Sequence, residues 1–146
     1  MKDTNLIEGG IYRDERGKIV FANDFNMAEI QRLYHIHQSD ISVIRAWQGH
    51  KKESKWFHCI KGSFLVYTIP VDNWSAPNKE LQAKTSFLNE TKSEVLHIPG
   101  GYANGFKALE EDSILMVFSD FTLEQSKEDD IRFDKDYWDA DWTKKQ

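Results

Sequence analysis

Residues 45–58 of the chain, Arg-Ala-Trp-Gln-Gly-His-Lys-Lys-Glu-Ser-Lys-Trp-Phe-His, carry more polar chemistry than a strand that only fills a core requires. The stretch holds a guanidinium, an amide, two imidazoles, several ammonium groups and three aromatic rings, and it lies between two apolar runs. Imidazoles can exchange protons near neutral pH, and guanidinium groups match the geometry of phosphate groups. We therefore predict that this stretch lines a binding pocket.

Each of these residues also has a structural interpretation. The lysines of this stretch can form a solvated hairpin, and Trp56 with Phe57 can form a subunit interface in place of a pocket wall. Tyr34, on a strand predicted just upstream, can belong to the core. Cys59, the one cysteine of the chain, is interpreted as a small buried hydrophobic residue and not as a nucleophile.

The composition limits the classes of protein to which the chain can belong. Its 146 residues suffice for one domain that buries about two-thirds of its unfolded surface. Nineteen basic and 24 acidic residues give a net charge of -5, which favours neither a nucleic-acid partner nor an anionic membrane. A single cysteine suits a reducing compartment, and the sequence shows no apolar run typical of a signal peptide or a membrane span. We expect a cytoplasmic protein.

Short apolar or alternating runs separated by turn residues predict β-strands along most of the chain. The predicted strand regions are residues 7–22 (a hairpin turning at Arg16-Gly17), 28–37, 41–47, 56–71 (a hairpin turning at Lys61-Gly62), 85–88, 94–98, 106–109 and 113–119. No long run has the helical period, so the pattern indicates an all-β antiparallel barrel or sandwich. We expect one domain over residues 1–146, with a core of about 9–122. The extension, 123–146, is expected to be a loop or short helix that packs back on the core.

The strand pattern resembles the cupins, which implies a double-stranded β-helix, or jelly-roll barrel. Cupins usually bind a metal through His-x-His, a downstream glutamate and another histidine that follows Pro-x-Gly. Here Gln48 and Asn104 stand at two of these histidine positions, which leaves His50 and Glu53. Neutral amides are poor ligands for zinc or iron, so we expect no metal and no other cofactor.

Several segments resemble the sugar-nucleotide branch of the cupins, the dTDP-4-dehydrorhamnose 3,5-epimerases and the dTDP-4-keto-6-deoxyhexose 3,4-ketoisomerases. Arg32-Leu33-Tyr34 and Arg45-Ala46-Trp47-Gln48-Gly49-His50-Lys51, followed by Gly62, are similar to the ketoisomerase pattern Arg-x-Tyr and Arg-Gly-x-His-Ala-His-Lys. Residues 98–106, Ile-Pro-Gly-Gly-Tyr-Ala-Asn-Gly-Phe, are similar to the epimerase segment Ile-Pro-x-Gly-Phe-Ala-His-Gly-Phe. Residues 131–134 with Trp138 are a weaker match to the epimerase tail, and the likeness covers about residues 9–138.

The resemblance implies a reaction that removes a proton beside a ketone. Such a reaction needs a base, a donor to the developing enolate oxygen, an acid and cations for the diphosphate. The catalytic candidates are His50 as base, Gln48 and Tyr34. The candidates for substrate binding are Arg32, Arg45, Trp47, Lys55, His58, His97, Tyr102 and Asn104. Among these, Arg45 and Lys55 are expected at the diphosphate, Tyr34 and Tyr102 at the sugar, and Trp47 stacked on the nucleobase.

Two departures from the family pattern leave two hypotheses for the function. Gln48 stands at the position of the catalytic histidine, and Met116, Val117 or Phe118 stands at the position of the tyrosine acid. Either another histidine has taken over as base, or the pocket binds a sugar nucleotide without this chemistry. The first hypothesis is a homodimeric epimerase or ketoisomerase acting on a dTDP-4-keto-6-deoxyhexose. The alternative is a non-catalytic sugar-nucleotide or carbohydrate-binding cupin of a polysaccharide pathway.

Overall fold

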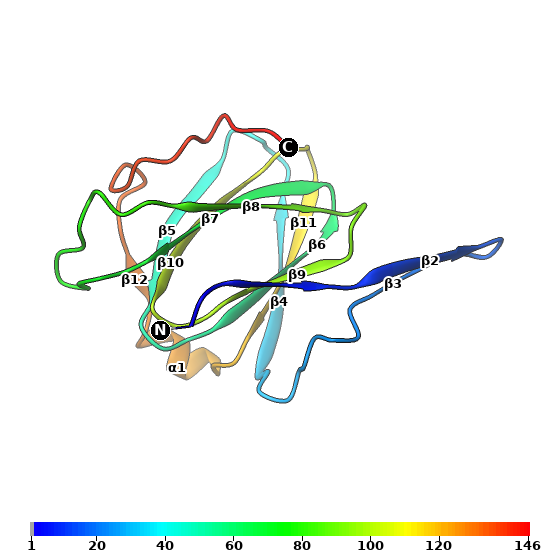
Figure 1. Cartoon of the computed structure of the whole chain (residues 1–146), viewed down its shortest axis with the longest axis horizontal. Coiled ribbons are helices and arrows are strands. Elements are labelled where there is room, and N and C mark those ends of the chain that lie inside the picture. The colour runs from blue at the N-terminus through cyan, green and yellow to red at the C-terminus, as the bar shows by residue number, and fades with distance from the viewer. Residues whose placement is uncertain (1) are drawn as a thin grey trace.

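The computed structural model describes residues 2–146, and its regular structure is almost entirely β-strand (Figure 1). The elements are β1 (Asn5–Glu8), β2 (Gly10–Asp14), β3 (Gly17–Phe21), β4 (Arg32–Gln38), β5 (Ile44–His50), β6 (Lys55–Lys61), β7 (Ser63–Pro70), β8 (Lys84–Asn89), β9 (Glu94–Ile98), β10 (Tyr102–Ala108), β11 (Ser113–Ser119), α1 (Leu123–Lys127) and β12 (Ile131–Arg132). The predicted all-β class is confirmed. No helix among residues 2–146 has the length and apolar character needed to cross a membrane.

Two five-stranded antiparallel sheets enclose the core. The first sheet has the order β1-β9-β6-β11-β4, and the second has the order β12-β5-β10-β7-β8. Alternate residues of each strand point between the sheets, where Phe57, Leu96 and Val117 of the first sheet form one buried cluster with Phe64 and Phe106 of the second. This arrangement confirms the predicted jelly-roll barrel.

The turn at Gly62 leads the chain from one sheet to the other. A hairpin between the strands on either side of Lys61-Gly62 was expected, but β6 pairs with β9 and β11, whereas β7 pairs with β8 and β10. The hairpin prediction is therefore wrong, although the turn is placed correctly. Gly62 has φ +74°, and a Cβ there would overlap the Ser113 side chain, so the crossing requires glycine.

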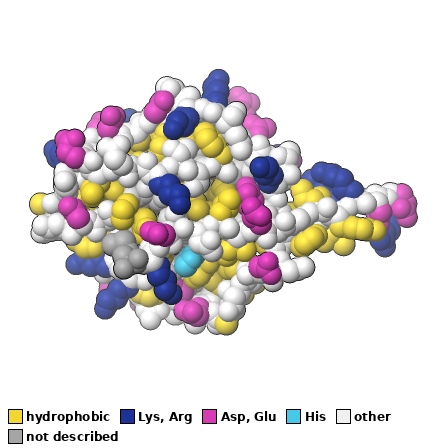
Figure 2. Space-filling model, viewed as in Figure 1, with side chains coloured by type: hydrophobic (Ala, Val, Ile, Leu, Met, Phe, Trp, Pro, Cys, Tyr) yellow, Lys and Arg dark blue, Asp and Glu magenta, His cyan; other side chains and the backbone are white. Residues whose placement is uncertain are grey.

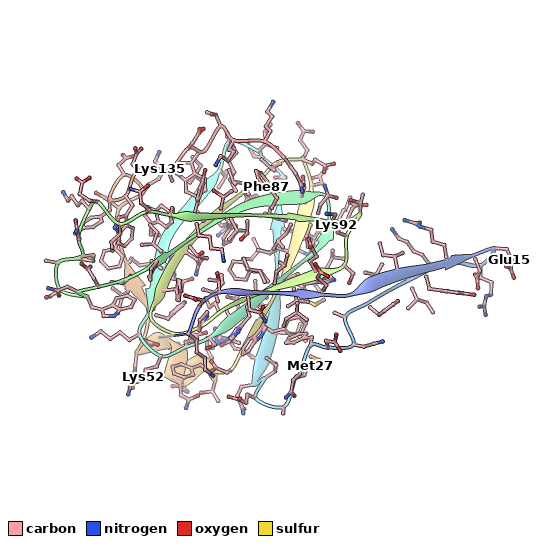
Figure 3. The ribbon with its side chains drawn as sticks, viewed as in Figure 1. Glu15, Met27, Lys52, Phe87, Lys92 and Lys135 are labelled. Carbon is pink, nitrogen blue, oxygen red and sulfur yellow. The ribbon has the colours of Figure 1, made fainter. Side chains whose placement is uncertain are left out.

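The predicted N-terminal hairpin is present as β2 and β3, which pair only with each other. It projects from the body of the molecule, with Glu15 at its tip (Figures 1 and 3). Apolar side chains lie along it (Figure 2), and Tyr12 and Ile19 are 57% and 61% exposed. This hairpin therefore contributes little to the hydrophobic core.

The C-terminal extension packs back on the core, as predicted, and the part after β12 covers the outer face of the second sheet. Thr122 caps α1 through a reciprocal pair of hydrogen bonds with Gln125, and β12 then adds a strand beside β5. Beyond β12, Trp138 is 1% exposed and belongs to an aromatic cluster on this face. The extension thus completes the second sheet and covers it.

Candidate active site

A cavity of about 390 Å³ lies at the inner faces of the two sheets. Three cationic residues, Arg45, Lys55 and Arg132, line it, and none of its lining residues is an aspartate or a glutamate. The full lining is Tyr34, Ile36, Ile44, Arg45, Ala46, Trp47, Gln48, Lys55, Phe57, Asn104, Phe106, Val117 and Arg132. Asp130 pairs with Arg132, which leaves Arg45 and Lys55 as lining cations without a carboxylate within 4.0 Å among the described residues, and the lining suits an anionic ligand.

A β-bulge in β5 arranges the side chains of this wall. Along the pair with β10, Gln48 lies opposite Asn104 and Ala46 lies opposite Gly105, so Trp47 has no partner in the register. Because of the extra residue, Ala46 and Trp47 both pack in the outer aromatic cluster, so Arg45 and Gln48, three positions apart, both line the cavity. The pocket predicted for residues 45–58 is therefore formed in part by a local irregularity of the strand.

Lys55 and Gln48 form the polar centre of the cavity. Lys55 is 3% exposed, and its Nζ donates a hydrogen bond to Gln48 Oε1 at 3.0 Å. Gln48 Nε2 in turn donates to Asp130 Oδ1 at 3.1 Å, which fixes the amide so that its oxygen faces the lysine. Burial lowers the pKa of Lys55 to about 8, because the charged form is poorly solvated there.

Tyr34 stands beside this pair on β4. Its ring centroid lies 5.8 Å from Lys55 Nζ and 5.4 Å from the guanidinium carbon of Arg32. Burial is the main cause that raises the pKa of Tyr34, so the phenol keeps its proton at neutral pH and can act as a hydrogen-bond donor.

Replacing Lys55 by methionine is expected to stabilise the protein at neutral pH. Below pH 8 Lys55 is protonated both in the folded chain, where its pKa is about 8, and in the unfolded chain, where the pKa is 10.5. Folding then includes desolvation of the ammonium, a penalty of about 3 kcal/mol, which the hydrogen bond to Gln48 offsets by about 1 kcal/mol. Lys55→Met should therefore raise the free energy of unfolding by about 2 kcal/mol at pH 7.

The pH dependence provides the check on this prediction. Between pH 8 and 10.5 the unfolded chain binds more protons at Lys55 than the folded chain does, so the wild type gains stability relative to Lys55→Met as pH rises. Urea unfolding at pH 7 and pH 10 measures the difference. An equal difference at both pH values would contradict the prediction.

His50 is buried next to the cavity and is not one of its lining residues. Its Nδ1 lies 2.6 Å from the backbone oxygen of Asp129, which fixes the Nδ1-protonated tautomer, and its Nε2 is buried without a hydrogen-bond partner. Burial lowers the pKa of His50, with a further contribution from the charge of Lys55. Burial thus favours the neutral imidazole, and His50 is not among the residues that line the cavity.

Glu53, the other residue left from the cupin metal pattern, is engaged in a buried network. Its carboxylate accepts hydrogen bonds from Ser119 Oγ at 2.5 Å and Ser126 Oγ at 2.8 Å, and it lies 3.4 Å from the Arg32 guanidinium. Arg32 also donates to the backbone oxygen of Phe121 at 3.1 Å. Arg32 therefore joins β4 to the chain after β11 and is not one of the residues that line the cavity.

The structure does not bring His58 and His97 to the cavity. On β6 the side chains of Lys55 and Phe57 point inward, so the His58 side chain points outward and its Nδ1 lies 3.0 Å from the backbone oxygen of Glu94. His97 stacks on Trp56 at a centroid distance of 4.5 Å, on the same outer face. The expectation that these two histidines line the pocket is therefore wrong, because the alternation of β6 and β9 directs both side chains away from the cavity.

Two further candidates have their side chains engaged elsewhere. The Tyr102 ring lies in the core cluster and its hydroxyl donates to Asp3 Oδ1 at 3.4 Å. Trp47 borders the cavity, but it is 1% exposed and its Nε1 donates to the backbone oxygen of Lys135 at 3.0 Å. The stacking of Trp47 on a nucleobase is therefore not supported by its position.

Arg132 was missed as a site residue. It enters the cavity lining because β12 pairs with β5 and places Arg132 opposite Gln48. Its Nε donates to Asp130 Oδ1 at 2.7 Å, the oxygen that also accepts from Gln48. The signal available in the sequence was the weak likeness of residues 131–134 to the epimerase tail.

The two-sheet barrel with its inner cavity has the cupin architecture that the strand pattern predicted. The sequence profile of dTDP-4-dehydrorhamnose 3,5-epimerase matches residues 1–146. The chain belongs to this family, whose members are epimerases and ketoisomerases, and the predicted resemblance is confirmed.

Known relatives agree with this assignment. A Haloferax volcanii protein named "Probable low-salt glycan biosynthesis epimerase Agl13" is 30% identical over an alignment of 147 positions, which covers 96% of this chain and 93% of the relative. The dTDP sugar isomerase of Desulfovibrio desulfuricans superposes with a TM-score of 0.76 at 16% identity, covering 98% of this chain and 92% of that one. A point mutant of the QdtA 3,4-ketoisomerase of Thermoanaerobacterium thermosaccharolyticum, in complex with TDP-4-keto-6-deoxyglucose, superposes with a TM-score of 0.70 at 22% identity, covering 94% and 92%. These superpositions support the fold.

Proposed function

We propose that this protein is an epimerase or ketoisomerase that acts on a dTDP-4-keto-6-deoxyhexose by removing a proton next to the ketone. The observation that carries the proposal is the cavity with Arg45, Lys55 and Arg132 in its lining and no carboxylate. A sugar nucleotide brings two negative charges in its diphosphate, and guanidinium groups bind phosphate oxygens through paired hydrogen bonds. The apolar part of the lining, which includes Phe57 and Phe106, suits the 6-deoxy end of the sugar.

The cavity also supplies donors for the intermediate. Proton removal from a carbon beside the ketone moves negative charge to the carbonyl oxygen, and a fixed donor lowers the energy of this enolate. Tyr34 presents a protonated phenol at the wall, and Asn104, which is 3% exposed, presents an amide. We assign the enolate contact to Tyr34 and a sugar contact to Asn104.

The proposal also includes the pathway, the cellular location and the oligomeric state of the protein. The relative named for glycan biosynthesis supports a role in assembling deoxysugars for a polysaccharide. A nucleotide-activated substrate and the free, buried thiol of Cys59 support a cytoplasmic location. The projecting β2–β3 hairpin, with exposed Tyr12 and Ile19, supports a homodimer, which sedimentation of the purified protein would test.

Hydrogen exchange into the substrate tests the proposed reaction. Incubation with dTDP-4-keto-6-deoxyglucose in heavy water should introduce deuterium at C3 or C5, detected by NMR and mass spectrometry. Binding of the sugar nucleotide without deuterium uptake would instead support the non-catalytic cupin of the second hypothesis. The proposal fails altogether if neither uptake nor binding is found.

The diphosphate contact is tested by Arg132→Ala. Loss of one charge-assisted contact should weaken dTDP binding about 10- to 100-fold. Arg16→Ala is the matched control, since Arg16 lies on the projecting hairpin, is 78% exposed and pairs only with Asp14 among the described residues. Equal affinities of the two variants would remove Arg132 from the binding site.

A further inference from the structure

The cavity lining contains one side chain that can lose and regain a proton close to neutral pH. Its titratable members are Tyr34, Arg45, Lys55 and Arg132. Guanidinium groups stay protonated in proteins, and burial raises the pKa of the Tyr34 phenol. Lys55 is left as the group that can accept a proton from a bound ligand. Burial lowers its pKa to about 8, with the charges of Glu53 and Asp130 opposing the shift and those of Arg32 and Arg132 adding to it.

The contacts of Lys55 are those of a base and not those of a structural ion pair. Within residues 2–146 no carboxylate oxygen lies within 4.0 Å of its Nζ, and its one hydrogen-bond partner is Gln48 Oε1, a neutral acceptor at 3.0 Å. A buried carboxylate in contact with the amine would hold the proton there. Gln48 orients the amine without fixing its charge, and Asp130 fixes Gln48 from the other side.

We infer that Lys55 is the catalytic base, and that Gln48, at the position where the family has histidine, is the residue that positions it. This inference rests on the proposed function. The neutral Lys55 amine takes the proton from C3, the C3–H electron pair forms the C3–C4 double bond, and the carbonyl electron pair moves to O4 as an enolate. Return of a proton to C3 gives the C3 epimer or the starting sugar. Its return to C4, with transfer of the 3-hydroxyl proton to O4, gives the 3-keto isomer.

His50 is the competing candidate, and its position argues against this role. It is 3% exposed, it lies outside the cavity lining, and its Nδ1 is held by the backbone of Asp129. Lys55 is equally buried, but its amine is part of the wall. A reacting carbon must come within hydrogen-bond reach of the base, which the geometry allows for Lys55.

Substitutions at Lys55 test the inference through deuterium exchange at C3. Lys55→Arg keeps the positive charge but cannot act as a base, and Lys55→Met removes both. Each variant should lose about 10²- to 10⁴-fold in exchange rate. Lys61→Met, at the exposed end of the same strand, should exchange at the wild-type rate. Exchange by Lys55→Arg within about threefold of the wild type would assign only a charge-stabilising role to Lys55 and overturn the inference.

The pH profile distinguishes the two candidate bases. With Lys55 as base, kcat/KM for exchange rises about tenfold per pH unit up to about pH 8 and then levels off. With His50 as base, the rise would end at a lower pH, because burial lowers the pKa of His50 from its ordinary value. Gln48→Glu places a carboxylate against Lys55, which should shift the midpoint to higher pH and lower the rate at pH 7 about tenfold or more. A wild-type profile that is flat above pH 7 would overturn the inference. So would loss of exchange in His50→Ala if Lys55→Arg keeps the pH profile of the wild type.

Binding of dTDP separates failure of this inference from failure of the proposed function. Lys55→Arg should still bind dTDP, which shows that the variant is folded and that its cavity is intact. If the wild type binds dTDP but does not exchange, the proposed reaction itself is wrong. If the wild type exchanges and Lys55→Arg does so equally, the reaction stands and the assignment of the base is wrong.

Discussion

Replacing Glu53 by alanine is expected to lower the free energy of unfolding by about 3–5 kcal/mol, the range typical of a buried ion pair that loses one partner. The Glu53 side chain is fully buried, and its carboxylate connects Arg32, Ser119 and Ser126. These residues belong to β4, β11 and α1. The substitution removes the carboxylate that accepts from the Ser119 and Ser126 hydroxyl groups, and it leaves the Arg32 guanidinium without its charged partner.

Urea unfolding of the purified variants measures this effect. Glu53→Gln keeps the size of the side chain and one acceptor oxygen, so its loss should be smaller than that of Glu53→Ala. Glu8→Ala, at an exposed position of β1, should change the stability by less than about 0.5 kcal/mol. A loss below about 1 kcal/mol in Glu53→Ala would show that the network is not a structural centre of the fold.

The second large effect is expected for Trp138→Ala, at about 3–5 kcal/mol. The Trp138 ring is 1% exposed and lies edge-on to Trp47 at a centroid distance of 5.5 Å, and its Nε1 donates to the backbone oxygen of Asn78 at 3.0 Å. Truncation leaves a large void between the extension and the second sheet. Because the same extension holds Arg132 at the cavity, the affinity for dTDP should fall together with the stability.

Calorimetry and dTDP titration together test this coupling. Trp138→Phe fills most of the space and should retain most of the stability and affinity. A variant that loses stability but binds dTDP as the wild type does would show that Arg132 is held by β12 alone.

The sequence predicted the strands well because alternation is a local signal. The bounds predicted for β9 and β11, residues 94–98 and 113–119, agree with the structure. The partners of the strands are not a local property, which is why the chain around Gly62 was assigned to a hairpin although it crosses between sheets. A turn residue shows that the chain reverses, but not which strand it meets next.

The site was predicted in part, for reasons that differ between residues. Tyr34, Arg45, Gln48, Lys55 and Asn104 line the cavity. Alternation alone would put Arg45 and Gln48 on opposite faces of β5, and the bulge at Trp47 brings both to the cavity. The outward direction of His58 could have been read from the alternation with Lys55 and Phe57. Motif position favoured His50, but its Nδ1 is held by the backbone oxygen of Asp129, a contact between distant parts of the chain that the sequence does not indicate. Arg132 depended on a two-residue strand, which leaves almost no periodic signal.

The crossing of the chain at Gly62 has a consequence for how the protein folds. Since β6 and β7 are consecutive in the chain but belong to opposite sheets, neither sheet can be completed from one continuous segment. Each sheet needs strands that are separated by dozens of residues, and the loops between them must be closed before the pairing can offset the lost chain entropy. The two sheets are therefore expected to fold and unfold together, in one cooperative transition.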